Sequence, residues 1–319
     1  MEIKFLHNTN FDFIGIRKPF FAISALLIIA GIVSLIVRGG PNYGIDFSGG
    51  TLLQVAFDKP VAMNQVRAAF ASSGIGNIEL QSTQGSQHNS IILRTKISDI
   101  SQDEFAAKVS GVLKQQFPER TATIERTEFV GPSVGKHLVK QAMFALFFSF
   151  IGIIIYVAFR FHSGIWGVAG VLGIMHDVFI VFGIFSLFNM EITLTIIAAF
   201  LTIAGFSIND TIVLFDRIRE NMKLIVKEGF GSIINKSINQ TLSRTIITSL
   251  TVFIVSLILF FMGGEVLHDF AFAMVVGTIV GVYSSIFVCS PLIFEWELYK
   301  KRKSSSAAAA KSSKYIRTV

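Results

Sequence analysis

The sequence predicts an α-helical polytopic membrane protein with six transmembrane helices and one extracytoplasmic α+β domain. Apolar residues make up 52% of the 319 residues and charged residues 15%, whereas a soluble globular protein has about 25% charged residues. The mean hydropathy of +0.62 excludes a disordered chain and a soluble fold with a charged surface. Cys289 is the one cysteine, which excludes a disulfide framework and a cysteine-based zinc site.

Six apolar runs reach the length of about 20 residues that a membrane-spanning helix needs. The first run is too long for the core of a signal peptide, and no small-residue cleavage site follows it, so we expect it to be retained. The spans are expected at 19–37, 141–159, 164–188, 192–215, 243–262 and 267–294. The chain then divides into five parts: an N-terminal segment (1–18), the first span (19–37), an outer domain (38–140), a five-helix region (141–295) and a basic tail (296–319).

The lysines and arginines of the short loops predict the orientation of the chain. Arg17 and Lys18 precede the first span, and Arg160 lies between the second and third spans. Five more follow the fourth span: Arg217, Arg219, Lys223, Lys227 and Lys236. The segment 300–319 holds seven of the 28 basic residues and no acid, so the rest of the chain has 21 of each sign. Because basic short loops stay in the cytoplasm, both termini are predicted to be cytoplasmic and 38–140 to lie outside.

The basic tail is typical of a protein whose partner is the lipid bilayer. A cluster of lysines and arginines directly after an apolar helix usually marks the cytoplasmic membrane face. We therefore expect no nucleic-acid partner. The segment 304–314 has low complexity and is expected to be disordered.

The outer domain at 38–140 is polar, and its periodicity alternates between two and 3.6 residues. Strands are expected at 51–57, 78–83, 91–95 and 121–130, and helices at 61–73 and 102–116. Ser101 is expected to cap the second helix with Glu104 in the capping-box position, and 84–89 is expected to be a polar turn. The order βαββαβ is that of the ferredoxin-like split motif, which hosts many functions.

Two glycine-rich segments bracket the outer domain. The first is Gly44-Ile45-Asp46-Phe47-Ser48-Gly49-Gly50, and the second is Phe129-Val130-Gly131-Pro132-Ser133-Val134-Gly135. Glycine permits positive φ and close backbone approach, as a junction between a span and a sheet requires; simple turn formation is the alternative interpretation. Neither segment matches a nucleotide-binding loop. Any ATP is therefore expected to bind another subunit.

Four ionisable residues lie at bilayer depth, where charge is costly and marks a functional site by default. His176 and Asp177 stand about 12 residues from the cytoplasmic end of the third span, which is about 18 Å and close to mid-membrane. Asp210 precedes Asp216 by six residues, or about 9 Å along a helix. Arg244 begins the fifth span on the same side, so it can face Asp210 across two helices.

A proton-coupled pair is the functional hypothesis for Asp210 and Arg244. A buried aspartate can cycle between protonated and charged forms, and a permanently charged arginine can hold the carboxylate. Loss of that contact can change the packing of two helices. The alternatives are a helix–helix hydrogen bond for Asp210 and a loop charge that reaches the headgroups for Arg244. His176 and Asp177 form either a second relay or a structural pair.

The remaining features have structural interpretations. The segment 217–240 is predicted to be a cytoplasmic amphipathic helix or a pair of helices. Small residues at helical spacing in the third and sixth spans indicate close helix packing: Gly167, Gly170, Gly173, Gly277 and Gly281.

Taken together, four features resemble one family over about 11–303. They are the two glycine-rich segments, His176-Asp177, and the run Ser207-Ile208-Asn209-Asp210-Thr211-Ile212-Val213-Leu214-Phe215-Asp216-Arg217-Ile218-Arg219-Glu220 that precedes Gln240-Thr241-Leu242-Ser243-Arg244-Thr245. In this order, spacing and six-span layout they resemble the SecD/SecF family of the resistance-nodulation-division superfamily. The outer domain is short, as in the smaller of the two subunit types of that family.

The resemblance implies a subunit of the bacterial inner membrane that forms a hetero-complex with SecD, which would supply six further helices in a pseudo-twofold arrangement. The further partners that it implies are the SecYEG channel, YajC, YidC, the ATPase SecA and an unfolded preprotein. It implies that the proton-motive force promotes translocation and periplasmic release of preproteins, with Asp210 and Arg244 in proton transport and without a cofactor.

Other functions stay open. One is a proton-driven small-molecule exporter of the same superfamily, and another is a passive scaffold of the export channel. An enzyme is not expected, because the sequence has no nucleophile–base set and no cluster with metal-ligand spacing.

Overall fold

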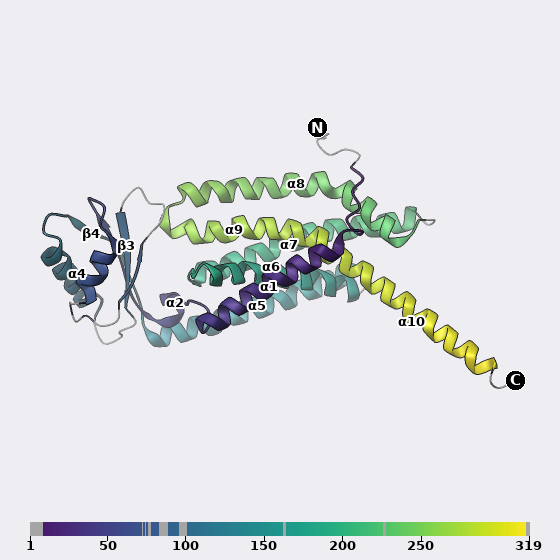
Figure 1. The fold of residues 1–319 in the computed structure, drawn as a ribbon, viewed down its shortest axis with the longest axis horizontal. Helices are drawn as coiled ribbons and strands as arrows, with labels where there is room; N and C mark the ends of the chain where they lie inside the picture. Colours follow the sequence, from purple (N-terminus) through teal and green to yellow (C-terminus); the bar gives the residue numbers. More distant parts are fainter. Residues whose placement is uncertain are drawn as a thin grey trace.

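The computed structural model describes residues 9–316 apart from 72, 74, 76–77, 83–88, 96–100, 162–163 and 226–227. Long helices form a bundle, and a small α+β domain covers one end of it (Figure 1). Within the described residues, six helices are long and apolar enough to cross a membrane, as predicted. Most of the predicted turn at 84–89 lies outside the described residues.

The apolar helices agree in place with the predicted spans, and several extend beyond them. They are α1 (Arg17–Arg38), α5 (Pro132–Phe161), α6 (Gly164–Leu187), α7 (Leu194–Leu224), α8 (Phe230–Met262) and α9 (Gly264–Ser284). The apolar run marks only the part of a helix that lipid can surround, whereas backbone hydrogen bonds continue into polar sequence. The predicted cytoplasmic segment at 217–240 is therefore the end of α7 and the start of α8, which confirms a pair of helices.

The chain continues beyond α9 as one long helix. A π-helical segment, η1 (Ser285–Cys289), joins α9 to α10 (Ser290–Ile316), and α10 projects away from the bundle (Figure 1). The prediction of disorder at 304–314 is thus wrong. Alanine and lysine are strong helix formers, and no glycine or proline follows Pro291 to end the helix.

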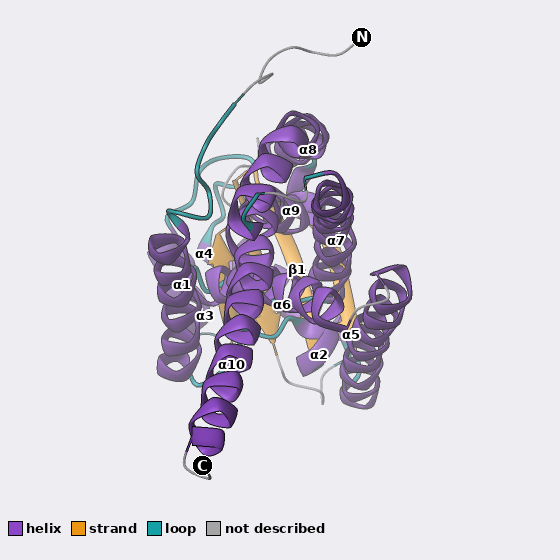
Figure 2. Cartoon of the chain, turned by 90° about the vertical axis from the view of Figure 1, so that its right-hand side faces the viewer, coloured by secondary structure: helices purple, strands orange, loops and turns teal. Residues whose placement is uncertain are grey.

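Helix α6 is the centre of the bundle. It is buried along most of its length and contacts α1, α5, α7 and α9, as Figure 2 shows from the end. Glycines permit this packing: a Cβ added to Gly31 of α1 would lie 2.7 Å from the Cα of Gly183, and one added to Gly277 of α9 would lie 2.4 Å from Ile203 of α7. The second contact confirms the packing that was predicted for the sixth span.

The α+β domain has the predicted order of strands and helices. Its elements are β1 (Gly50–Phe57), α3 (Met63–Ala71), β2 (Ile78–Ser82), β3 (Asn89–Thr95), α4 (Gln102–Gln116) and β4 (Ala122–Val130). The four strands are antiparallel in the order β2-β3-β1-β4. Leu53, Val55 and Leu93 pack against α3 and α4 in one apolar core. Ser101 caps α4 and accepts from the Glu104 N–H at 3.3 Å, as predicted.

The two glycine-rich segments meet where the domain joins the bundle. The first forms a short helix, α2 (Ile45–Ser48), and then turns through Gly49 (φ +71°) and Gly50 (φ +130°). Gly135, in the first turns of α5, packs on this turn, because an added Cβ would lie 3.0 Å from the carbonyl oxygen of Phe47. The segments therefore form one junction.

Gly135→Ala is expected to destabilise the protein by about 1–3 kcal/mol, since the new methyl group would press on backbone atoms that cannot rotate away. Gly131→Ala is the matched control, because a Cβ there has no atom within 4 Å among the described residues. Thermal unfolding of the purified protein in detergent measures the difference. Equal melting temperatures for the two variants would contradict tight packing at the junction.

The end of the bundle opposite the sheet holds the N-terminal segment. Asp12 accepts from the Gly15 N–H at 2.8 Å and from Asn235 of α8 at 2.6 Å. These bonds favour the carboxylate and hold the pKa of Asp12 below its ordinary value. At neutral pH Asp12 is therefore charged and accepts both hydrogen bonds. Their contribution to stability is lost as the pH falls through the lowered pKa of Asp12.

Candidate functional site

A cluster of hydrogen-bonded polar side chains lies inside the bundle, where four helices meet. We name it the buried polar cluster. Its members are Ser24 of α1, His176 and Asp177 of α6, Ser207 of α7, and Tyr283 and Ser284 of α9. The structure therefore brings His176 and Asp177 together with four residues that the sequence analysis did not select.

Asp177 is the hub of the buried polar cluster and has no exposed surface. Its Oδ1 lies 2.8 Å from His176 Nδ1. Its Oδ2 accepts from Ser207 at 2.5 Å and from Ser284 at 2.8 Å. Each carboxyl oxygen is thus engaged, as a polar group buried in an apolar bundle requires.

A chain of hydrogen bonds leads from His176 toward α1. The second ring nitrogen, Nε2, lies 2.9 Å from Ser24 Oγ, and Ser24 Oγ lies 2.9 Å from Tyr283 Oη. Tyr283 donates to the backbone carbonyl of Phe20 at 2.6 Å, and its ring stacks on the imidazole of His176. Four polar groups are consequently connected in one line across α6, α1 and α9.

Small residues let the helices reach Asp177. An added Cβ on Gly173 would collide with the sulfur of Cys289 in η1, and one on Gly281 would lie 3.4 Å from Ser207. Cys289 is fully buried and lies 3.8 Å from the hydroxyl of Thr211. The π-helical turn therefore follows directly after Ser284 and fills the space beside Gly173.

Asp210 lies on α7, one helical turn after Ser207. It is buried, and its Oδ1 accepts from Thr245 of α8 at 3.3 Å. Within the described residues, its Oδ2 has no hydrogen-bond partner. Half of this carboxyl group is therefore unsatisfied, in contrast to Asp177.

Arg244 is exposed and lies near Asp210 without an ion pair between them in the described chain. The prediction that Asp210 faces the start of the fifth span is confirmed, but the contact is made by Thr245. The loop interpretation of Arg244 is wrong, because Arg244 lies well inside α8, which begins at Phe230. Successive helical residues point in different directions, and Thr245 rather than Arg244 makes the hydrogen bond to Asp210.

These contacts give the two aspartates different chemical capacities. A buried carboxylate without full hydrogen bonding is costly, and protonation removes the charge. Asp210 can take or release a proton while it keeps its Thr245 bond. Asp177 can do so only through its bond to His176, because Ser207 and Ser284 occupy its other oxygen.

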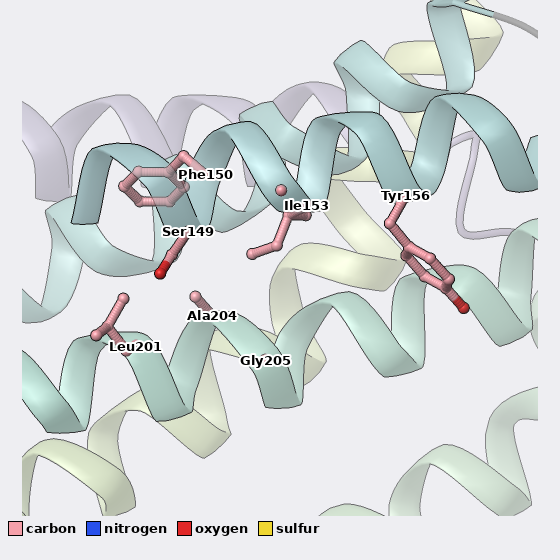
Figure 3. A pocket seen from close by; sticks show the side chains of 8 residues that line it. Ser149, Phe150, Ile153, Tyr156, Leu201, Ala204 and Gly205 are labelled. Carbon is pink, nitrogen blue, oxygen red and sulfur yellow. The ribbon is translucent and has the colours of Figure 1, made fainter. Parts of the chain in front are cut away.

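The outward face of α7 carries small and polar residues. A groove of about 370 Å³ separates α7 from α5, with Ser149 and Phe150 of α5 opposite Leu201 and Ala204 of α7 (Figure 3). Exposed residues at alternating spacings of three and four continue this face: Thr195, Ala198, Thr202, Gly205 and Asn209. This alternation of spacings is a signal that the sequence itself carries.

No group of three or more His, Cys, Asp or Glu side chains that could hold a metal ion occurs among the described residues. The four added members of the buried polar cluster gave no comparable sequence signal. A serine or tyrosine in an apolar helix has the same appearance whether it faces a partner or its own backbone.

Comparisons with known proteins place these residues in a family context. The family description "Protein export membrane protein SecD/SecF, C-terminal" matches 109–299, and "SecD/SecF GG Motif" matches 33–61. The chain is 50% identical over 301 residues to "Protein translocase subunit SecF" of Endomicrobium trichonymphae, covering 94% of this chain and 96% of that one. The protein of the same name from Calditerrivibrio nitroreducens is 43% identical over 298 residues, 93% and 97% of the two chains.

Two solved structures are similar in fold. The crystal structure of SecDF, a translocon-associated membrane protein from Thermus thermophilus, has a TM-score of 0.82 and 37% identity over 91% of this chain. A crystal structure of SecDF in a super-membrane-facing form has a TM-score of 0.68 and 36% identity over 95% of this chain. The chain spans 39% and 41% of the length of those two SecDF chains.

Proposed function

The chain belongs to the SecD/SecF family of protein-export membrane proteins, as a translocase subunit of the SecF type, and from that premise we propose that it couples proton movement to preprotein export. Membership makes it a multi-pass membrane protein of the bacterial Sec machinery and a transport protein rather than an enzyme. The likeness to SecDF implies partnership with SecD. Coupling to the proton-motive force is the proposal.

The observation that carries the proposal is the half-satisfied carboxyl of Asp210. It is buried on α7, bonded by one oxygen to Thr245 of α8 and close to the charge of Arg244. A proton that binds to it removes a buried charge, and a proton that leaves restores the attraction to Arg244. Each event changes the energy of packing α7 against α8, as a proton-driven step requires.

Helix α7 connects this carboxyl to the outer domain. Its first residue, Leu194, donates its N–H to Asp46 in the first glycine-rich segment at 2.9 Å. Glu191, just before α7, pairs with Arg94 of β3. From Leu194 to Asp210 the helix is about 24 Å long. A shift of α7 would therefore act directly on the domain that we propose contacts preproteins.

The proposed orientation places the α+β domain, which we assign to the ferredoxin-like class from its strand order, in the periplasm. The N-terminal segment and the last turn of α5, where Arg160 pairs with Asp216, lie at the other end of the bundle (Figure 1). This arrangement fits the positive-inside rule, with both termini in the cytoplasm.

We propose that SecD covers the exposed polar face of α7 and α8. The exposed threonines of this face, Thr202, Thr248 and Thr251, donate to backbone carbonyls of their own helices. Asn209 of α7 and Arg244 of α8 are also exposed, and hydrocarbon cannot hydrogen-bond to their side chains. A partner helix with polar groups would satisfy them and would enclose Asp210. The SecYEG channel, SecA, YajC, YidC and an unfolded preprotein are the further partners of this proposal.

The test is preprotein export into inverted membrane vesicles that contain SecD, SecYEG and SecA with ATP. Export is measured with and without a proton gradient, in vesicles that carry or lack this chain. Coupling predicts that the gradient accelerates export only when the chain is present, and that an ionophore removes the acceleration. If the gradient accelerates export equally in vesicles that lack the chain but retain SecD, the chain would instead be a passive scaffold of the export channel.

A further inference from the structure

We propose that Asp177, His176, Ser24 and Tyr283 form a proton relay through the bundle. Asp177 is its buried end, and Tyr283 is its end at the surface between α1 and α9. The inference deepens the proposed function and rests on it. It assigns roles to Ser24 and Tyr283 and makes the His176–Asp177 pair a carrier of protons rather than a structural contact. The hydrogen-bond directions in the buried polar cluster carry the argument.

The direction of each bond follows from the number of hydrogens available. Tyr283 has one hydroxyl hydrogen and donates it to the Phe20 carbonyl at 2.6 Å. In the 2.9 Å contact with Ser24, Tyr283 can then only accept, so Ser24 donates its single hydrogen to Tyr283. In its other contact Ser24 must accept, and the donor is His176 Nε2 at 2.9 Å. Nε2 therefore carries a hydrogen.

The contact between His176 and Asp177 must then contain a further proton. With Nε2 protonated, the 2.8 Å contact of Nδ1 with Oδ1 is a hydrogen bond in only two forms. Either Asp177 is protonated and donates to a neutral imidazole, or an imidazolium donates to a carboxylate. In both forms the pair holds one proton more than a neutral imidazole beside a carboxylate.

Release of that proton reverses every bond in the relay. The proton between Asp177 and His176 settles on Nδ1, the Nε2 hydrogen passes to Ser24, and the Ser24 hydrogen passes to Tyr283. The original hydroxyl hydrogen of Tyr283 points to the carbonyl of Phe20, one turn from the start of α1 at Arg17, and it leaves to water at that end of α1. Tyr283 then donates to Ser24, Ser24 donates to Nε2, and Nδ1–H donates to the carboxylate. One proton has left, and a proton that binds at Tyr283 and passes back along the same bonds restores the first state.

The inner end of the relay points to α7. Ser207 donates to Asp177 Oδ2, and Asp210 follows Ser207 by one turn on the same side of α7. Among the described residues, the other titratable groups beside Asp177 are His176 on its own helix and the Cys289 thiol in η1, and Tyr283 of α9 stacks on His176. From α1 only the hydroxyl of Ser24 takes part. The relay therefore connects the helix that carries Asp210 to the α1–α9 surface.

The first test compares hydroxyl deletions in the gradient-driven export assay. Ser24→Ala and Tyr283→Phe are each expected to reduce the gradient-dependent part of the rate at least about tenfold, as removal of a group from a proton-transfer path does, while Ser24→Thr retains it. Ser34→Ala is the matched control, since Ser34 also joins α1 to α6, through Ser186 at 2.8 Å, outside the relay. Co-purification with SecD is measured for each variant.

The outcomes separate the relay from the proposed function. If wild type responds to the gradient and both deletions respond equally well, the relay is refuted and the coupling proposal stands. If wild type does not respond, the coupling proposal itself fails. Loss of response in Ser34→Ala as well would show a general packing effect and would also refute the relay.

A second measurement does not depend on export. Nitrogen-15 NMR reports the tautomer of His176 when the histidines of this chain, in complex with SecD, carry the label. Among the six histidines, His176 is identified by the signal that is absent in His176→Gln. The relay predicts a hydrogen on Nε2 at low pH and the Nδ1–H tautomer at high pH, with a changed transition in Tyr283→Phe. One unchanged tautomer between about pH 5 and pH 9, a range that spans ordinary histidine titration, would overturn the relay.

Discussion

Asp210→Asn is expected to abolish the acceleration of export by a proton gradient while the complex with SecD still assembles. Asparagine has the size of aspartate, and its oxygen can still accept from Thr245, which lies 3.3 Å from Oδ1. It cannot bind and release a proton. The variant therefore retains the packing of α7 on α8 and loses only the change of charge that we propose drives the step.

The expected magnitude is complete loss of the gradient-dependent rate, with the ATP-driven rate unchanged. Asp216→Asn is the matched control on the same helix, because Asp216 is partly exposed and pairs with Arg160 at 2.6 Å at the end of the bundle. Such surface pairs contribute about 0–1 kcal/mol, so this control should export as wild type does. A normal gradient response in Asp210→Asn, with SecD bound, would mean that Asp210 only joins two helices by a hydrogen bond.

The parts of the fold that depend on local signals could be predicted from the sequence. The α+β domain follows from alternating apolar residues and from turn and cap signals, and Ser101 caps α4 where expected. The six spans follow from apolar length alone. The ends of α7 and α8 could not be placed this way, because a helix continues into polar sequence wherever its backbone bonds are formed and nothing interrupts it.

The candidate site could be predicted only in part, since contacts between helices depend on rotation and packing. Asp210 and Asp177 are conspicuous as charges in apolar runs. Ser24 and Tyr283 are not, because their importance comes from lying next to His176 in space. The partner of Asp210 was expected to be Arg244 and is Thr245, a difference of one residue or about 100° around the helix.

Asp177→Ala is expected to prevent accumulation of the folded chain, in contrast to Asp210→Asn. Its side chain accepts from Ser207 and Ser284 and bonds to His176. Truncation leaves Ser207 and His176 Nδ1 unpaired in the centre of the bundle, leaves Ser284 only its bond to the Gly281 carbonyl, and opens a cavity. Each unpaired buried group costs about 1–3 kcal/mol, so a total loss of several kcal/mol, much of the stability of an ordinary domain, is expected. The amount of chain in membranes and its melting temperature in detergent measure the effect.

Asp177→Asn distinguishes a relay from a structural pair at the same position. The asparagine oxygen can accept from Ser207 and Ser284, and its NH2 group can donate to His176 Nδ1, which reproduces the bonds of protonated Asp177. This variant should therefore accumulate and melt like wild type. Because the amide cannot release its proton, the gradient response should be lost. Normal stability together with a normal gradient response would mean that Asp177 serves only to hold the four helices together.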